Sequence, residues 1–136
     1  MVREICKDVF FLSQKSEPAT REDAAIGRDL QDTLKDNKDR CVGMAANMIG
    51  YKKNIIIVNM GSFNVVMYNP VILKQSGAYE TQEGCLSLEG VRTTTRYQQI
   101  EVEYYDFRWK KQRQKYHGWT AQIIQHEIDH LSGKII

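Results

Sequence analysis

The chain has 136 residues, of which 42% are apolar and 26% charged, and its formal net charge is +2 at pH 7. At about 100–200 residues per domain, this length predicts one domain over residues 1–136. The composition is that of a globular protein and excludes disordered, collagen-like and coiled-coil chains. The longest aliphatic run, residues 55–58, is far shorter than the about 20 residues of a membrane span. The near balance of charge requires no polyanionic partner.

The beginning of the chain and its cysteines predict a cytoplasmic location. The apolar patch Val9–Leu12 is shorter than the roughly 7–15 residues of a signal-peptide core. Cys6, Cys41 and Cys85 are odd in number and widely spaced, which is typical of a reducing compartment rather than of a disulfide framework. Each thiol is therefore expected to serve packing, metal binding or nucleophilic chemistry.

The N-terminal half predicts one helix and one hairpin. Apolar residues at helical spacing predict an amphipathic helix over about 20–36. A glycine- and alanine-rich loop is expected over 41–50. The β-branched run 54–60 predicts a buried strand, and 63–68 is its expected hairpin partner. The Asn-Pro pair at 69–70 is expected to break that partner.

The C-terminal half predicts more strands and a last helix. Residues 71–82 predict one or two weaker strands, and 82–90 an irregular segment with two glycines. Residues 96–107 alternate apolar and polar side chains and predict a strand, to which 113–117 returns antiparallel. Residues 119–131 predict a helix. Strands grouped between two helices indicate an α+β fold, with antiparallel or mixed sheets packed around the C-terminal helix.

The sharpest chemical feature is an HExxH pattern on that last predicted helix. Positions i and i+4 lie one turn apart on the same face, so His126 and His130 can direct two imidazoles at one metal ion. Glu127 lies about 100° round the helix from His126, where a general base for a metal-bound water is needed. The alternative, two unrelated histidines on a buried helix, is disfavoured because pattern and helical context coincide.

Two histidines leave such a site one protein ligand short, because a catalytic metal usually takes three. Residues 131–136 offer no ligand side chain, and Ile136 stands where a metzincin has its third histidine. We therefore expect the third ligand upstream, which disfavours a zinc endopeptidase. The candidates are several carboxylates, His117, Cys6, Cys41 and Cys85. Gly84 lets the backbone approach a site closely, which favours its neighbour Cys85.

Three segments resemble the signature motifs of the peptide deformylase family. Residues 83–87 (EGCLS) and 125–131 (QHEIDHL) match its second and third motifs. Residues 43–50 (GMAANMIG) are similar to the first, G-φ-A-A-x-Q-φ-G, in which φ is apolar. The resemblance runs from the residue-20 helix to Gly133. The family removes the formyl group from the N-terminal formylmethionine of new bacterial and organellar proteins, which implies formyl-Met nascent peptides as substrates here.

The resemblance implies a metal centre and a catalytic base. Cys85, His126 and His130 would hold one divalent ion, Fe²⁺ as the family's usual metal, with Zn²⁺ or Ni²⁺ as substitutes. Glu127 would be the general base and then the acid. The metal and the backbone N–H of Leu86 would hold the tetrahedral oxyanion.

The resemblance also implies where the substrate lies. An extended peptide would pair with the backbone at Val42, Gly43 and Gly84. Its methionine side chain would enter an apolar pocket near Val42, Ile123 and the first histidine. Arg92 aligns with an arginine on the substrate's exit path, although a solvated loop arginine is equally expected.

One residue departs from the family pattern. Met48 stands where the first motif has Gln, and a thioether cannot donate a hydrogen bond to the oxyanion. Losing one such donor typically costs about 10²–10³ in turnover. Asn47 carries an amide, but neighbouring loop residues usually point in different directions, so its donation to the oxyanion in place of Gln is disfavoured. The alternative is that Asn47 and Met48 only fill the loop.

This departure leaves two hypotheses for the function. The first is an active but slower deformylase. The second is a deformylase-like protein that binds a metal and N-terminal Met peptides without useful turnover. Glu127 favours the first, because a general base has little purpose in a pure binder.

A basic cluster lies in the predicted hairpin around residues 107–117. Two aromatic residues, Trp109 and Tyr116, are interleaved with its charges. Its basic members are Arg108, Lys110, Lys111, Arg113 and Lys115. A transient contact with ribosomal RNA is one interpretation. A solvated hairpin tip is favoured because the total charge is near neutral, and no specific nucleic acid is predicted.

Asp129 is the acidic residue between the two histidines of the motif. On a helical wheel it faces away from the metal. It is expected either to support the site by pairing with Arg96 or to face solvent.

Overall fold

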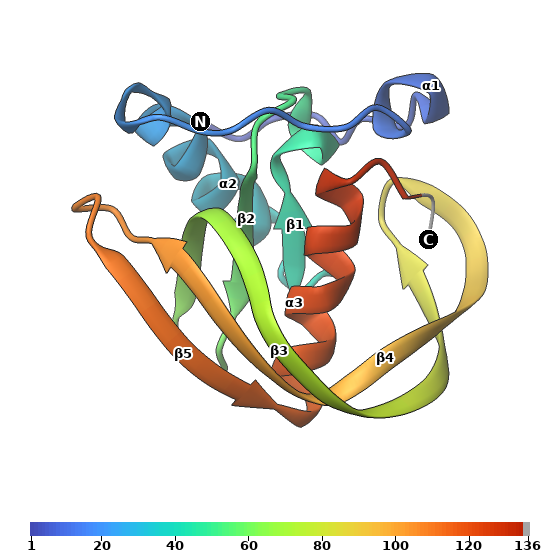
Figure 1. Ribbon diagram of the computed structural model, residues 1–136. Helices are drawn as coiled ribbons and strands as arrows, with labels where there is room; N and C mark the ends of the chain where they lie inside the picture. The colour runs from blue at the N-terminus through green and yellow to red at the C-terminus, as the bar shows by residue number, and fades with distance from the viewer. Residues whose placement is uncertain (135–136) are drawn as a thin grey trace.

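A computed structural model describes residues 1–134 of the chain. One five-stranded sheet, in the order β1-β2-β3-β4-β5, curls around a central helix (Figure 1). The strands are β1 Gly43–Ala45, β2 Ile55–Asn59, β3 Asn64–Cys85, β4 Leu88–Tyr105 and β5 Lys111–His117. The helices are α1 Val9–Leu12, α2 Ala24–Asp36 and α3 Gly118–Leu131, with 3-10 turns at Arg21–Asp23 and Ala46–Ile49. The expected α+β fold is confirmed, and all strand pairs of the sheet are antiparallel.

Both predicted helices are present. Before α2, the backbone N–H of Thr20 donates to the Asp23 carboxylate at 2.8 Å, which stabilises the start of the first turn. Helix α2 then buries Leu30 and Leu34 and packs on β2. The return of β5 antiparallel to β4 is also confirmed.

The expected break at Asn69-Pro70 is wrong. Strand β3 continues through it, with a shift in register between Tyr68 and Val71. Asn69 adopts a positive φ of 53° there. Its side chain holds the bend by accepting from the Ala19 N–H at 2.7 Å and donating to the Ala19 carbonyl at 2.9 Å. A proline is tolerated at such a bulge because no ladder hydrogen bond is required of it.

The expected irregular segment 82–90 is also wrong. Strand β3 runs to Cys85, β4 resumes at Leu88, and only a tight turn separates them. Gly84 pairs with Val91, and the register shifts between Gly84 and Cys85. The pairing of the two strands thus overrides the local signal of the glycines, and it sets Cys85 at a strand end.

Helix α3 lies inside the curl of the sheet and contacts β1, β2, β4 and β5 (Figure 1). The aliphatic run 55–58 of β2 is fully buried, as is Ile124 of α3. Each fully buried aliphatic side chain contributes about 1.5–3 kcal/mol. Because α3 is buried, its polar side chains need partners within the protein.

Gly27 gives a test of the packing between α2 and β3. An alanine Cβ at this position would lie 2.0 Å from the Tyr68 hydroxyl oxygen. Alanine normally stabilises a helix interior by about 1 kcal/mol relative to glycine, but overpacking a core typically costs about 1–3 kcal/mol. We predict that Gly27→Ala lowers the free energy of unfolding by about 1–3 kcal/mol in urea denaturation.

The control is the same substitution in a Tyr68→Phe background, where the clashing oxygen is gone. Part of the loss should be recovered there. An equal loss in both backgrounds would contradict this account of the contact.

Candidate active site

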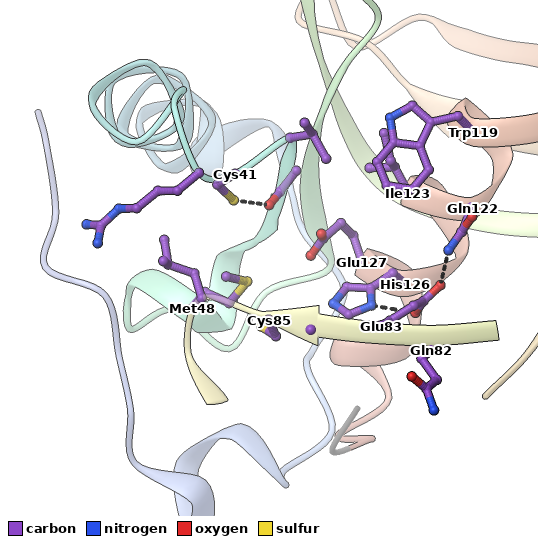
Figure 2. Close-up of a pocket in the computed structure, with 15 residues that line it drawn as sticks. Cys41, Met48, Gln82, Glu83, Cys85, Trp119, Gln122, Ile123, His126 and Glu127 are labelled. Atoms are coloured by element: carbon purple, nitrogen blue, oxygen red, sulfur yellow. Dashed lines mark hydrogen bonds and ion pairs between the residues drawn. The ribbon is translucent and has the colours of Figure 1, made fainter. Parts of the chain in front are cut away.

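A pocket of about 230 Å³ opens beside α3 (Figure 2). Its lining comes from three segments that are far apart in the sequence: residues 40–43 with Met48, residues 82–86, and α3. These segments carry the three motifs recognised in the sequence. The fold therefore brings all three motifs to one pocket.

Three ligand-type side chains meet next to this pocket. The ligand atoms of Cys85, His126 and His130 all lie within 4.8 Å of one another. The two Nε2 atoms are 3.0 Å apart, which follows from the i, i+4 spacing on α3. His130 is fully buried and His126 is 7% exposed.

The two histidines of this group have opposite pKa shifts. Burial and the neighbouring His126 lower the pKa of His130 to about 3, so its ring is neutral. Burial also opposes charge on His126, but hydrogen bonds with Cys85 and Glu83 outweigh it and raise the pKa of His126 to about 10. Positive charge is thus favoured on His126 and opposed on His130. Two imidazoles and a thiol are a donor set for Fe²⁺, Zn²⁺ or Ni²⁺, so these residues fit a metal ion.

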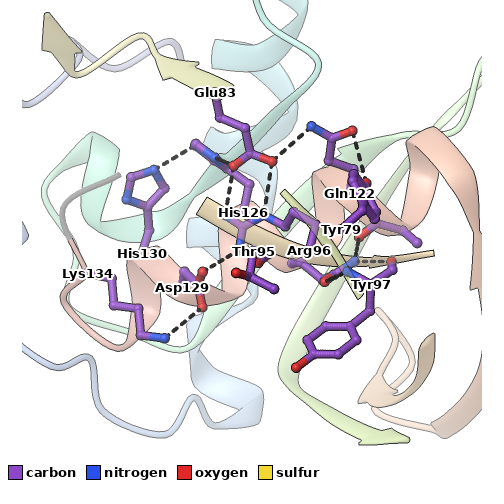
Figure 3. Close-up of polar contacts among 12 residues, drawn as sticks. Tyr79, Glu83, Thr95, Arg96, Tyr97, Gln122, His126, Asp129, His130 and Lys134 are labelled. Carbon is purple, nitrogen blue, oxygen red and sulfur yellow. Dashed lines mark hydrogen bonds and ion pairs between the residues drawn. The ribbon is translucent and has the colours of Figure 1, made fainter. Parts of the chain in front are cut away.

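Glu83 organises the surroundings of the ligands (Figure 3). Its Oε1 accepts from His126 Nδ1 at 2.7 Å and from Arg96 Nη2 at 2.7 Å. Its Oε2 accepts from Arg96 Nε at 2.9 Å and from Gln122 Nε2 at 2.9 Å. Burial alone would raise the pKa of Glu83, but the bonds from His126, Arg96 and Gln122 lower it to about 2. The carboxylate therefore stays ionised, and its bond to Nδ1 turns the Nε2 atom of His126 toward Cys85 and His130.

Glu83 was not among the functional residues expected from the sequence. A signal for it exists, because residues two apart in a strand point to the same face. Glu83 precedes Cys85 by two positions in β3. An acidic residue at that spacing from a ligand is a natural partner for a histidine of the same site.

Asp129 extends the network beyond the ligands. Arg96 Nη1 donates to its Oδ2 at 2.6 Å, and Lys134 Nζ lies 3.5 Å from its Oδ1. The expectation that Asp129 pairs with Arg96 is confirmed. On the other side, the Tyr79 hydroxyl donates to Gln122 Oε1 at 3.3 Å, which fixes the amide that bonds Glu83.

Glu127 faces the pocket from α3, although it is only 5% exposed (Figure 2). Its Oε1 has no hydrogen-bond partner among the described residues. Burial raises the pKa of this carboxyl to about 7. A Cβ atom at Gly43 would lie 2.7 Å from the Ile123 side chain and 3.0 Å from the Glu127 side chain. The glycine therefore lets the backbone of β1 run this close to α3.

The structure separates the other predicted site residues into two groups. The pocket lining contains Val42, Gly43, Met48, Gly84, Leu86 and Ile123. Two of the predicted residues, Asn47 and Arg92, lie outside it. The Arg92 guanidinium donates to the Glu89 carbonyl at 3.2 Å, and Asn47 Nδ2 donates to the His130 carbonyl at 2.9 Å. Trp119, which is 61% exposed, lines the pocket and was not anticipated.

The basic cluster of the β4–β5 hairpin is partly neutralised. Arg113 pairs with Glu101, and Lys111 lies 3.2 Å from Glu103. Trp109 stacks on Tyr105 with ring centroids 4.9 Å apart, so this face of the indole is already covered. The ribosomal contact stays a prediction.

A histidine pair and a thiol beside a pocket that contains a buried carboxyl fit the class of metal-dependent hydrolases. The sequence family described as polypeptide deformylase matches residues 2–136. Peptide deformylase of Clostridium beijerinckii is 54% identical over the full length of both chains. Peptide deformylase 3 of Shewanella oneidensis is 32% identical over 91% of this chain and 79% of its own.

Solved structures agree with these relatives. A peptide deformylase from Legionella pneumophila has a TM-score of 0.88 at 30% identity and covers 99% of this chain and 83% of its own. An actinonin-bound class I type b peptide deformylase from Acinetobacter baumannii has a TM-score of 0.87 at 28% identity, over 99% of this chain and 95% of its own. The chain belongs to the peptide deformylase family, which confirms the resemblance. No helix among residues 1–134 is both long and apolar enough to cross a membrane.

Removing Glu83 tests how far the site depends on its buried charge. Glu83→Ala leaves Arg96, whose side chain is 3% exposed, without its two-point partner. Breaking a buried pair in this way typically costs about 3–5 kcal/mol. We predict a loss of that size in the free energy of unfolding, measured by urea denaturation.

The matched control is Glu103→Ala, which removes the exposed pair with Lys111. An exposed pair is worth about 0–1 kcal/mol. Similar losses from the two substitutions would argue against a special role of the buried carboxylate.

Proposed function

We propose that this chain removes the N-formyl group from the N-terminal formylmethionine of newly made polypeptides in the cytoplasm, with Cys85, His126 and His130 holding one divalent metal ion. Membership of the deformylase family supports the reaction. The observation that carries the assignment of residues is the convergence of these three ligand atoms within 4.8 Å of one another. Fe²⁺ is the proposed native ion, and Zn²⁺ or Ni²⁺ suits the same donors.

The bound ion would act as a Lewis acid and lower the pKa of a water molecule. Glu127 is the proposed general base, because its Oε1 has no hydrogen-bond partner within residues 1–134 and burial raises the pKa of its carboxyl to about 7. Glu127 takes a proton from the water that adds to the formyl carbon. It returns this proton to the amine nitrogen as the C–N bond breaks, so formate and a free N-terminus leave.

The peptide is proposed to lie extended along β1. This strand is at one edge of the sheet, where an extended peptide can add as a further strand. Gly43 lies in β1, Val42 precedes it, and Gly84 lines the same pocket from β3. Ile123 and Trp119 supply apolar surface for the methionine side chain.

Oxyanion stabilisation is the step that distinguishes the two functional hypotheses. Met48 lines the pocket, and its Sδ accepts from the Ala45 N–H at 3.4 Å. The amide nitrogen of Asn47 is already bonded to the His130 carbonyl. We therefore assign the protein's remaining donor to the Leu86 N–H. A deformylase-like binder with little turnover is the alternative that Met48 favours.

Formate release from formyl-Met-Ala-Ser tests the proposed reaction, with Fe²⁺ protein kept under anaerobic conditions. We predict that Glu127→Gln lowers the rate by about 10²–10⁴, because the amide cannot accept the proton. The variant should still bind Zn²⁺, because none of the three ligands is changed. If the parent releases no more formate than Glu127→Gln, the binder hypothesis replaces the enzyme.

Met48→Gln tests the missing donor. The glutamine oxygen can accept the Ala45 N–H in place of the thioether, which leaves the amide nitrogen to donate into the pocket. We predict a rise in kcat, up to about 10²-fold. Met48→Leu has a similar size and no donor, so it should give no rise. An unchanged rate in Met48→Gln would show that another group already fills this role.

A further inference from the structure

The last turn of α3 carries a metal ligand at the end of a helix. His130 is the residue before the last of α3. Carbonyl groups in a last turn have no partner within the helix, and such turns fray unless other donors satisfy them. The exact place of the His130 ring therefore depends on what holds this turn.

Two distant segments hold the end of the helix. Asn47 Nδ2 donates to the His130 carbonyl at 2.9 Å, and the Ser16 N–H donates to the Leu131 carbonyl at 2.8 Å. The Gly133 N–H adds a local bond to the His130 carbonyl at 3.0 Å. Of these donors, Asn47 is the one that reaches the His130 carbonyl from a distant part of the chain.

The burial of Asn47 indicates that its amide has a role beyond filling space. The side chain is fully buried, and its Oδ1 has no partner among the described residues. An unpaired buried oxygen is costly, whereas an apolar side chain of similar size would avoid that cost. A carbonyl can only accept, so the nitrogen of Asn47 must be the atom that faces His130.

The two histidines of the site differ in how their rings are fixed. The Nδ1 of His126 is held by Glu83, while the Nδ1 of His130 has no side-chain partner within residues 1–134. The backbone of its turn is therefore the main control on where the His130 ring points. We propose that Asn47 is a positioning residue that keeps His130 in place for metal binding, an inference that rests on the proposed metal centre.

Metal affinity tests the inference without relying on turnover. Asn47→Ala should raise the Zn²⁺ dissociation constant, measured against a chromophoric chelator, by about 10–100-fold, as loss of a group supporting a ligand typically does. The absorption bands of the Co²⁺-loaded protein should shift as well, because the geometry of the ligands changes. Asn47→Asp keeps the size but turns an acceptor toward the carbonyl, so it should weaken binding at least as much.

Asn37 provides a matched control. It is 5% exposed, and its Nδ2 donates to the Thr33 carbonyl at 2.8 Å at the end of α2, which carries none of the three ligands. Asn37→Ala should lower the urea midpoint much as Asn47→Ala does. Its Zn²⁺ dissociation constant should stay within about twofold of the parent, because no group supporting a ligand is lost.

Each outcome decides something different. Parental Zn²⁺ affinity in folded Asn47→Ala or Asn47→Asp overturns the inference, because packing alone would then suffice. If both variants fail to fold, Asn47→Ser, which keeps a donor, replaces them. A Zn²⁺ dissociation constant no higher in Asn47→Ser than in the parent supports the inference. Complete loss of Zn²⁺ binding in Asn47→Ser overturns it. A parent that binds neither Zn²⁺ nor Co²⁺ rejects the proposed metal centre instead.

Discussion

A buried carboxylate, Glu83, is the group on which the rest of this site depends. Placing a charge in the interior is costly unless it is paired and fully hydrogen-bonded. Glu83 meets that condition through two nitrogens of Arg96, one of His126 and one of Gln122. These four bonds join β3, β4 and α3 at one point. The same bonds that satisfy the charge therefore also orient a metal ligand.

The arrangement gives two carboxyls of one pocket opposite properties. Glu83 is surrounded by donors and stays ionised, whereas one oxygen of Glu127 has no partner within residues 1–134 and burial raises the pKa of this carboxyl to about 7. This separation of environments supports the proposal that Glu83 orients the site and Glu127 transfers the proton. The proposed roles follow from the number of hydrogen-bond donors around each carboxyl, not from the residue type.

Features set by local rules were predictable from the sequence. The i, i+4 spacing of His126 and His130 needs only a helix, and the apolar spacing of α2 and α3 supplied one. The family resemblance assigned the third ligand to Cys85, which the sequence context alone favoured among several candidates. Strand pairing was harder to predict from the sequence, because the continuity of β3 through Asn69-Pro70 depends on Ala19, which is 50 residues away in the chain. The role of Asn47 at the end of α3 likewise depends on a bond that spans 83 residues.

The central place of α3 also bears on how the protein is made. All five strands precede this helix in the chain, yet they curve around it. During synthesis the concave face of the sheet is therefore complete before its occupant exists, and apolar surface stays uncovered until the helix arrives. Two of the three proposed ligands lie on that helix. Binding of the proposed metal would thus mark the end of folding, and a nascent copy of this enzyme would itself depend on protection from aggregation until then.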